Sequence, residues 1–267
     1  MPRDDVPATG SQDAYGPAQI ARRISAAGVA KGQSAASQLF VLAVLAGAFI
    51  ALGALFYTLI ISDSALGAGP TRLIGGLAFA VGLVLVVIAG GELFTGNALM
   101  SLPWLEGRLT MGALLRNWSI VYVGNLVGAL LIAVFVVLSG VLNSPALSAT
   151  AADMADTKLS LTMTEAFFRG ILCNMLVCLA VWMSAAARSA SGKVAVILLP
   201  IAAFVAIGFE HSIANMYVVP VAMLKGVVSH DPVGFVRNLV VVTAGNVVGG
   251  GILIAGAYWV VFGKPES

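Results

Sequence analysis

Three ionisable side chains, Glu92, Glu210 and His211, stand within otherwise apolar stretches of the sequence. Burying such groups is costly, so each is a candidate functional residue. An imidazole can donate a hydrogen bond or a proton, which suits the anion of a weak acid. We therefore interpret His211 as a pore residue. The alternative is a buried histidine whose hydrogen bonds are merely satisfied. The other histidine, His230, lies in a polar loop.

The two glutamates begin related strings, ELFTGN at Glu92 and EHSIAN at Glu210, and each string interrupts an apolar run. An interrupted helix leaves backbone N–H groups without partners, and a carboxylate at the interruption can accept hydrogen bonds from them. We therefore expect both glutamates to stabilise helix breaks structurally. Direct contact with a permeant molecule is the alternative.

A second pair of strings follows at nearly the same spacing. GNLVGA begins at Gly124 and GNVVGG begins at Gly245, 121 positions later, whereas the two glutamates are 118 positions apart. Matching strings in matching order predict an internal repeat, which is common in transport proteins. The asparagines of these strings, Asn125 and Asn246, and also Asn174, either line a path or tie helices together. The sequence leaves both interpretations open.

The elements that position these residues are predicted to be membrane-spanning helices. Charged residues make up only 10% of the chain and apolar residues 60%, whereas soluble domains carry about 25% charge. Segments of about 20 apolar residues can span a bilayer. We predict an all-α, polytopic membrane protein in which the second and fifth spans are broken and the second half is inverted. The six predicted spans cover residues 38–61, 73–90, 118–139, 165–187, 194–209 and 238–262.

The ends of the chain are predicted to be cytoplasmic. Nine of the fourteen Lys and Arg residues fall on the side of the termini, and positive charge favours the cytoplasmic side. We expect a multi-pass protein of a bacterial cytoplasmic (inner) membrane. It would have a tail over residues 1–37, one pore domain over 38–262 and a short tail over 263–267. Residues 18–31 have the pattern of an amphipathic interfacial helix, with a solvated tail as the alternative.

Several function classes find no support in the sequence. No nucleophile–base pair, phosphate-binding loop or metal-ligand cluster is recognisable, so we expect no enzyme, cofactor or metal site. No basic stretch interleaved with aromatic residues suggests nucleic-acid binding. A haem-binding subunit would need axial ligands, which His211 and His230 are badly placed to provide. Glu165 and Arg169 stand at a helix entrance and are interpreted as interfacial anchors. A pore for neutral solutes remains an alternative, although it would not need a titratable histidine.

Three longer strings resemble the formate/nitrite transporter family. Residues 208–216 (GFEHSIANM) resemble its fifth-helix signature, residues 91–97 (GELFTGN) its broken second helix, and residues 170–183 (GILCNMLVCLAVWM) its fourth helix. The resemblance covers nearly the whole chain after about Ala27. It implies an aquaporin-like protomer in a homopentamer, with one pore per protomer. It also implies passage of small monovalent anions such as formate, nitrite or hydrosulfide, in some members together with a proton.

The resemblance also implies roles for individual residues. His211 would face Thr95 at the centre of the path, while Lys158, Asn174 and Asn246 would lie near it. Hydrophobic constrictions would flank the centre. The residues of one constriction would be Leu83, Leu93 and Phe94, and those of the other Phe79, Val177 and Phe204.

The substrate is less well defined by the sequence. Residues 215–220 (NMYVVP) favour a formate channel, whereas Glu92 with Gly96 and Asn97 also occurs in nitrite and hydrosulfide types. Formate is therefore the predicted anion, with nitrite or hydrosulfide as alternatives. The sequence leaves open the direction of transport and the choice between a passive channel and proton symport.

Overall fold

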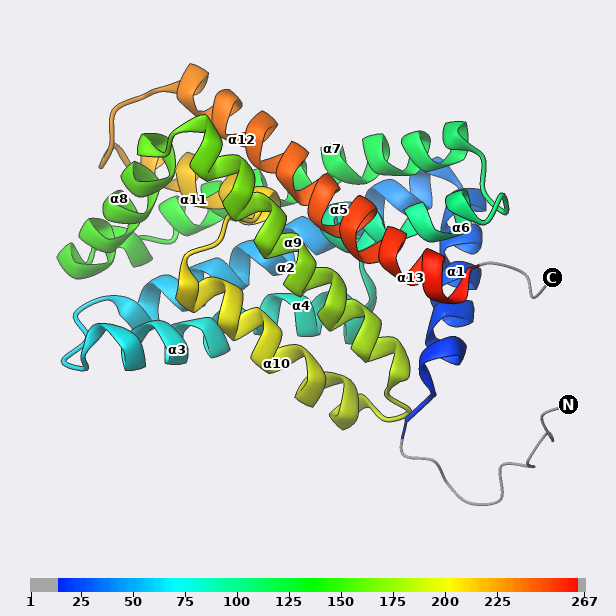
Figure 1. The fold of residues 1–267 in the computed structure, drawn as a ribbon. Helices are drawn as coiled ribbons and strands as arrows, with labels where there is room; N and C mark the ends of the chain where they lie inside the picture. Colours follow the sequence, from blue (N-terminus) through cyan, green and yellow to red (C-terminus); the bar gives the residue numbers. More distant parts are fainter. Residues whose placement is uncertain (1–13, 264–267) are drawn as a thin grey trace, which may run out of the picture.

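The computed structural model describes residues 14–263, and long helices dominate this part of the chain (Figure 1). Six helical segments are long and apolar enough to cross a membrane, which confirms the predicted all-α, six-span architecture. They begin two to seven residues earlier than predicted, because their first turns extend beyond the apolar runs. Four are single helices: α2 (Ala36–Ile61), α7 (Met111–Leu138), α9 (Met163–Ala186) and α10 (Ala190–Ile207).

The other two spans contain π-helical segments. The second span consists of α3 (Ala68–Phe79), α4 (Val81–Leu85) and the π-helix η1 (Val86–Gly90). The sixth consists of α12 (Pro232–Val247), the π-helix η4 (Val248–Ile254) and α13 (Ala255–Phe262). Such π-segments occur frequently at functional sites. Here η1 immediately precedes the first helix break.

Both predicted helix breaks are present. After residues 91–93 the chain continues in three short helices: α5 (Phe94–Asn97), the 3₁₀ helix η2 (Ala98–Met100) and α6 (Ser101–Leu105). After residues 208–211 it continues in α11 (Ser212–Lys225). Gly208 ends α10 in the left-handed conformation, with φ 88°, which glycine adopts without strain. The breaks therefore place the ends of four helical segments inside the protein.

Two further helices lie at opposite ends of the molecule (Figure 1). α1 (Pro17–Gln33) lies near both ends of the described chain, and its Ile20 and Ala21 are buried in a cluster with Leu102 and Trp182. A helix is therefore present where one was predicted, and it packs onto the body, whereas its place at a membrane interface stays a prediction. The other helix, α8 (Pro145–Ser160), follows the short η3 (Val141–Asn143) and was not predicted.

The internal repeat is longer than the sequence indicated. Each half begins with one of these end helices, continues with a span and a broken span, and closes with a further span. α1 and α8 are therefore equivalent elements, and they lie on opposite sides of the molecule, as an inverted repeat requires (Figure 1).

The crossing of α2 and α7 depends on glycine. A Cβ atom at Gly128 of α7 would overlap the backbone carbonyl oxygen of Val44 in α2, and one at Gly47 of α2 would overlap the backbone of Asn125. Small residues permit such close helix approach in membranes. The crossing thereby sets the position of Asn125, which contacts the first helix break.

We expect Gly128→Ala to destabilise the folded protein, because the new Cβ meets backbone rather than a movable side chain. Overpacking of this kind costs about 1–3 kcal/mol. Gly112→Ala is the matched control in the same helix, since its Cβ would meet nothing within 4 Å and alanine is the better helix former by about 1 kcal/mol. Thermal unfolding in detergent compares the two variants. Equal melting temperatures would contradict the importance of this close approach.

Candidate functional site

The two helix breaks meet at a hydrogen bond between Thr95 and His211. The Thr95 Oγ1 and His211 Nε2 atoms are 2.9 Å apart. Thr95 belongs to α5 and His211 is the N-cap residue of α11, so each half of the repeat supplies one partner. Both side chains are buried. The structure thus brings together the central pair that the family resemblance implied.

The backbone determines which ring nitrogen of His211 carries the proton. The N–H group of Ala214 donates to His211 Nδ1 at 3.1 Å, so Nδ1 must be an acceptor. In the neutral ring the proton is then on Nε2, which donates to Thr95 Oγ1. The Thr95 hydroxyl keeps its own hydrogen for another acceptor. Protonation of Nδ1 would break the bond that caps α11, so the geometry favours His211 as a hydrogen-bond donor in its neutral form.

Asn174 holds the backbone of Thr95 in place by a hydrogen bond. Its Nδ2 donates to the carbonyl oxygens of Thr95 at 3.2 Å and of Asn246 at 2.7 Å. Cys178 Sγ also lies 3.4 Å from the Thr95 carbonyl oxygen. The Oδ1 atom of Asn174 is buried and has no partner among the described residues. Asn174 therefore has a structural role at the centre and keeps one acceptor free, and its predicted contact with a permeant stays a prediction.

Two equivalent asparagines hold the breaks. Asn125 Oδ1 accepts from the backbone N–H of Phe94 at 2.9 Å, and its Nδ2 donates to the carbonyl oxygen of Glu92 at 2.9 Å. In the second half, Asn246 makes the corresponding contacts with the backbones of Ser212, Glu210 and Gly170. Of the two open interpretations, these contacts favour tying helices together. We expect Asn246 to act on the path through the backbone it holds.

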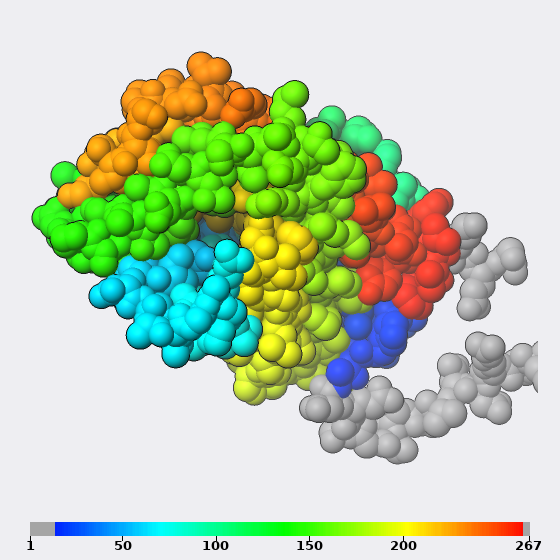
Figure 2. Space-filling view, turned by 60° about the vertical axis from the view of Figure 1, so that its left-hand side comes forward, coloured from blue at the N-terminus to red at the C-terminus, as the bar shows by residue number. Residues whose placement is uncertain are grey.

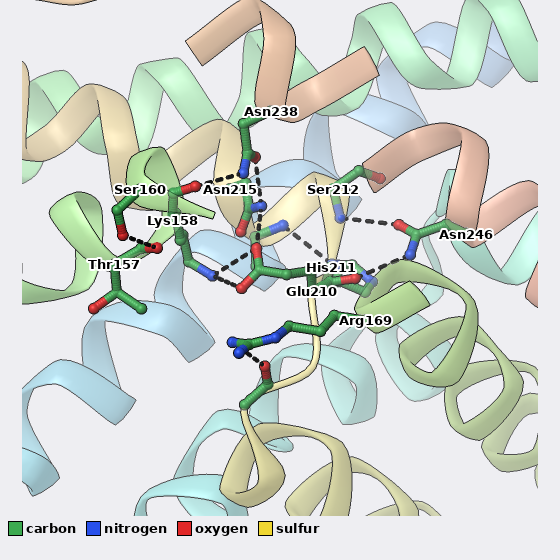
Figure 3. Close-up of polar contacts among 12 residues, drawn as sticks. Thr157, Lys158, Ser160, Arg169, Glu210, His211, Ser212, Asn215, Asn238 and Asn246 are labelled. Atoms are coloured by element: carbon green, nitrogen blue, oxygen red, sulfur yellow. Dashed lines mark hydrogen bonds and ion pairs between the residues drawn. The ribbon is translucent and has the colours of Figure 1, made fainter. Parts of the chain in front are cut away.

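The predicted partners of the two glutamates are wrong. The carboxylate of Glu210 receives hydrogen bonds from Lys158 Nζ at 3.0 and 3.2 Å and from Asn215 Nδ2 at 2.7 Å, rather than from backbone N–H groups (Figure 3). Asn215 also donates to Asn238, which in turn donates to the carbonyl oxygen of Lys158. An amide can serve a broken helix as both donor and acceptor, whereas a carboxylate only accepts. The asparagines therefore satisfy the backbone, and the glutamate binds the cation.

The same cluster recurs in the first half. Lys31 Nζ lies 3.2 Å from Glu92 Oε2 and donates to Asn97 Oδ1 at 2.7 Å. Asn97 donates to both Glu92 and Asn117. Lys31, the equivalent of Lys158, is thus a site residue that the sequence analysis missed. One signal was available: Asn117 and Asn238 are 121 positions apart, the spacing already found for Asn125 and Asn246.

The six predicted constriction residues are all buried, in one apolar cluster. The rings of Phe79 and Phe204 meet edge to face with centroids 5.6 Å apart, and the Phe204 ring stacks on His211 at 5.9 Å. Phe94 instead packs against Trp118 and Tyr122. The structure therefore places one aromatic pair directly beside the centre. The constriction role of all six residues stays a prediction.

A cavity of about 660 Å³ leads to the centre from the side away from α1. Its mouth is the hollow between α3, α8 and α10 (Figure 2). Arg72, Lys158 and Arg169 line it, and it reaches Phe204 and His211. Arg169, predicted to be an interfacial anchor, thus lines this cavity. We call this cavity the Lys158-side vestibule.

Known proteins share this architecture. The chain matches the family model of the formate/nitrite transporters over residues 18–260. It is 42% identical to a probable formate transporter of Methanothermobacter thermautotrophicus, over 93% of this chain and 97% of the relative. It is 39% identical to the formate channel FocA of Escherichia coli K12, over 92% and 94%. A solved pentameric formate channel with formate bound is similar in fold, with a TM-score of 0.77 and 38% identity over 86% of this chain and 98% of that chain.

Proposed function

The chain belongs to the formate/nitrite transporter family, as a multi-pass membrane channel or transporter, and on that premise we propose that it conducts formate. Nitrite and hydrosulfide are the alternative anions. We propose further that it works as a homopentamer in a bacterial cytoplasmic membrane, with both termini in the cytoplasm. The probable formate transporter and the formate channel named above support the choice of anion, and the pentameric structure supports the assembly.

This proposal rests mainly on the Thr95 hydroxyl, a hydrogen-bond donor that lies beside His211 among apolar residues. His211 donates to Thr95, and the Thr95 hydroxyl is left to donate to a permeant. An anion moved into apolar surroundings faces a barrier of at least several kcal/mol. A hydrogen bond to a charged group offsets about 1.5–3 kcal/mol of such a barrier. A neutral solute would not need this arrangement, nor the cations of the vestibule.

The proposed passage has three steps. An anion enters the Lys158-side vestibule, attracted by its cations, and sheds water at Phe79 and Phe204. It then accepts a hydrogen bond from Thr95 beside His211. It then leaves on the other side of the protein, past the equivalent cluster around Lys31 and Glu92. Proton linkage would require His211 to take up a proton, which the Ala214 hydrogen bond opposes.

Uptake by proteoliposomes tests the substrate. Formate, nitrite, hydrosulfide and lactate are compared at two pH values, with glycerol and urea as neutral probes. We expect saturable formate uptake that exceeds uptake of glycerol and urea. Fast glycerol or urea uptake without anion uptake would favour the neutral-solute pore instead.

We expect Phe204→Ala to increase leak and weaken selectivity among anions, because a hydrophobic constriction excludes hydrated ions by dewetting. The ratio of lactate to formate uptake is the measurement. Phe135→Ala is the control, since Phe135 is 60% exposed on the surface of α7, away from the path. An unchanged ratio in a normally assembled Phe204→Ala protein would count against this constriction.

A further inference from the structure

The repeat provides an internal comparison for Arg169. The backbone N–H of Glu210 donates to the carbonyl oxygen of Arg169 at 3.3 Å, and that of Glu92 donates to the carbonyl oxygen of Leu42 at 3.1 Å. Arg169 and Leu42 are therefore equivalent positions, and their backbones support the two breaks in the same way. Because leucine suffices in the first half, the break does not need a guanidinium. The positively charged side chain is therefore present on one side of the proposed path, and the equivalent position on the other side carries leucine.

The guanidinium of Arg169 makes only one weak hydrogen bond to the described part of the protein. Its Nη1 lies 3.5 Å from the carbonyl oxygen of Gly208, a long hydrogen bond, and it makes no ion pair with any residue of 14–263 (Figure 3). The nearby carboxylate of Glu165 is already bound by the backbone and hydroxyl of Thr162. Lys158, by contrast, is paired with Glu210. Arg169 thus keeps donors free.

Arg169 also decides the charge of the vestibule. Three cations and two carboxylates line the cavity, which leaves a formal charge of +1 when the histidine is neutral. Without the arginine the formal charge is zero. The lining residues that carry charge are Arg72, Lys158, Arg169, Asp153 and Glu210.

We propose that Arg169 forms, beside Lys158, an entry site for small planar oxyanions in the Lys158-side vestibule. A guanidinium presents parallel N–H groups that fit two oxygens of one carboxylate, which an ammonium cannot do. Formate and nitrite each offer two such oxygens, whereas hydrosulfide offers a single atom. The site thus selects oxyanions at the entrance. It also makes the channel asymmetric, because the equivalent position on the other side is Leu42.

This inference rests on the proposed anion conduction, and saturation kinetics from each side tests it. Proteoliposomes of known orientation are assayed with wild type, Arg169→Leu and Arg169→Lys. For Arg169→Leu we expect the half-saturating formate concentration to rise about fivefold to tenfold for entry from the Lys158 side, the effect of one partly exposed charge-assisted contact. Entry from the Lys31 side and maximal flux should stay unchanged.

Arg169→Lys separates charge from shape. It keeps the positive charge, so hydrosulfide entry should be nearly normal, while formate and nitrite entry should weaken by an intermediate factor. Lys225→Met is the control, because Lys225, at the end of α11, does not line the vestibule and binds Asn143 instead. It should leave both curves unchanged.

The outcomes are distinguishable. Normal wild-type uptake with unchanged curves for Arg169→Leu would overturn the entry site alone. Equal weakening from both sides would also overturn it, since that result indicates a general structural defect. If wild type conducts none of the anions, the proposed function fails and this inference fails with it.

Discussion

Replacing His211 by phenylalanine is expected to abolish anion passage. The change removes the Nε2–H donor to Thr95 and the Nδ1 acceptor that caps α11 at Ala214. Two lost contributions of about 1.5 kcal/mol each correspond to roughly a hundredfold loss of flux. Formate uptake by proteoliposomes measures the effect.

A phenylalanine at this position could also disturb folding, so assembly and melting temperature are measured alongside. Glycerol and urea uptake serve as controls for a pore that stays open to neutral species. A folded His211→Phe protein with formate uptake within a few-fold of wild type would show that the centre of the path lies elsewhere.

Replacing Lys158 by methionine is expected to destabilise the protein strongly, because Glu210 would be left as a buried charge without its cation. Removing one partner of a buried ion pair costs about 3–5 kcal/mol. Lys31→Met should cost less: the Lys31 side chain is 33% exposed, against 15% for Lys158, so water screens Glu92 better than Glu210. Melting temperatures in detergent measure the two losses of stability, and we expect the lower value for Lys158→Met.

The double variant Lys158→Met with Glu210→Gln tests the cause. Neutralising the carboxylate removes the uncompensated charge, so we expect it to recover much of the lost stability. A double variant less stable than Lys158→Met alone would contradict the buried-charge explanation. The amide oxygen of the new glutamine can still accept the hydrogen bond that Asn215 donates to Glu210 in the wild type.

The six spans and both breaks could be predicted because apolar length and its interruption are written directly in the sequence. α8 could not, since its small and polar residues form no clear apolar stripe. α1 carried a recognisable pattern, but its packing onto the body depends on contacts with distant helices such as α9. Its equivalence to α8 also emerged only in three dimensions.

The chemistry of the breaks was predicted only in part. Glu92 and Glu210 were recognisable as unusual, but their cations come from α1 and α8, far away in the sequence. That asparagines rather than carboxylates satisfy the backbone also follows from tertiary contacts. Arg169 was interpreted as an anchor because its position at a helix entrance is visible in the sequence, whereas the vestibule is not.

Formate flux as a function of pH, compared between wild type and His211→Asn, tests the role of the central histidine most directly. Asparagine is a good N-cap residue, so it can accept from Ala214, and its amide can still donate, but it does not titrate. In wild type the Ala214 hydrogen bond opposes protonation, so His211 stays a neutral donor until the pH is low enough for Nδ1 to take up a proton, which breaks the cap and changes the donor set. We therefore expect His211→Asn to retain formate passage and to lose most of the pH dependence. Identical pH profiles for the two proteins would contradict titration of His211 during transport, and loss of formate passage in a folded His211→Asn protein would contradict its role as a neutral donor that an amide can replace.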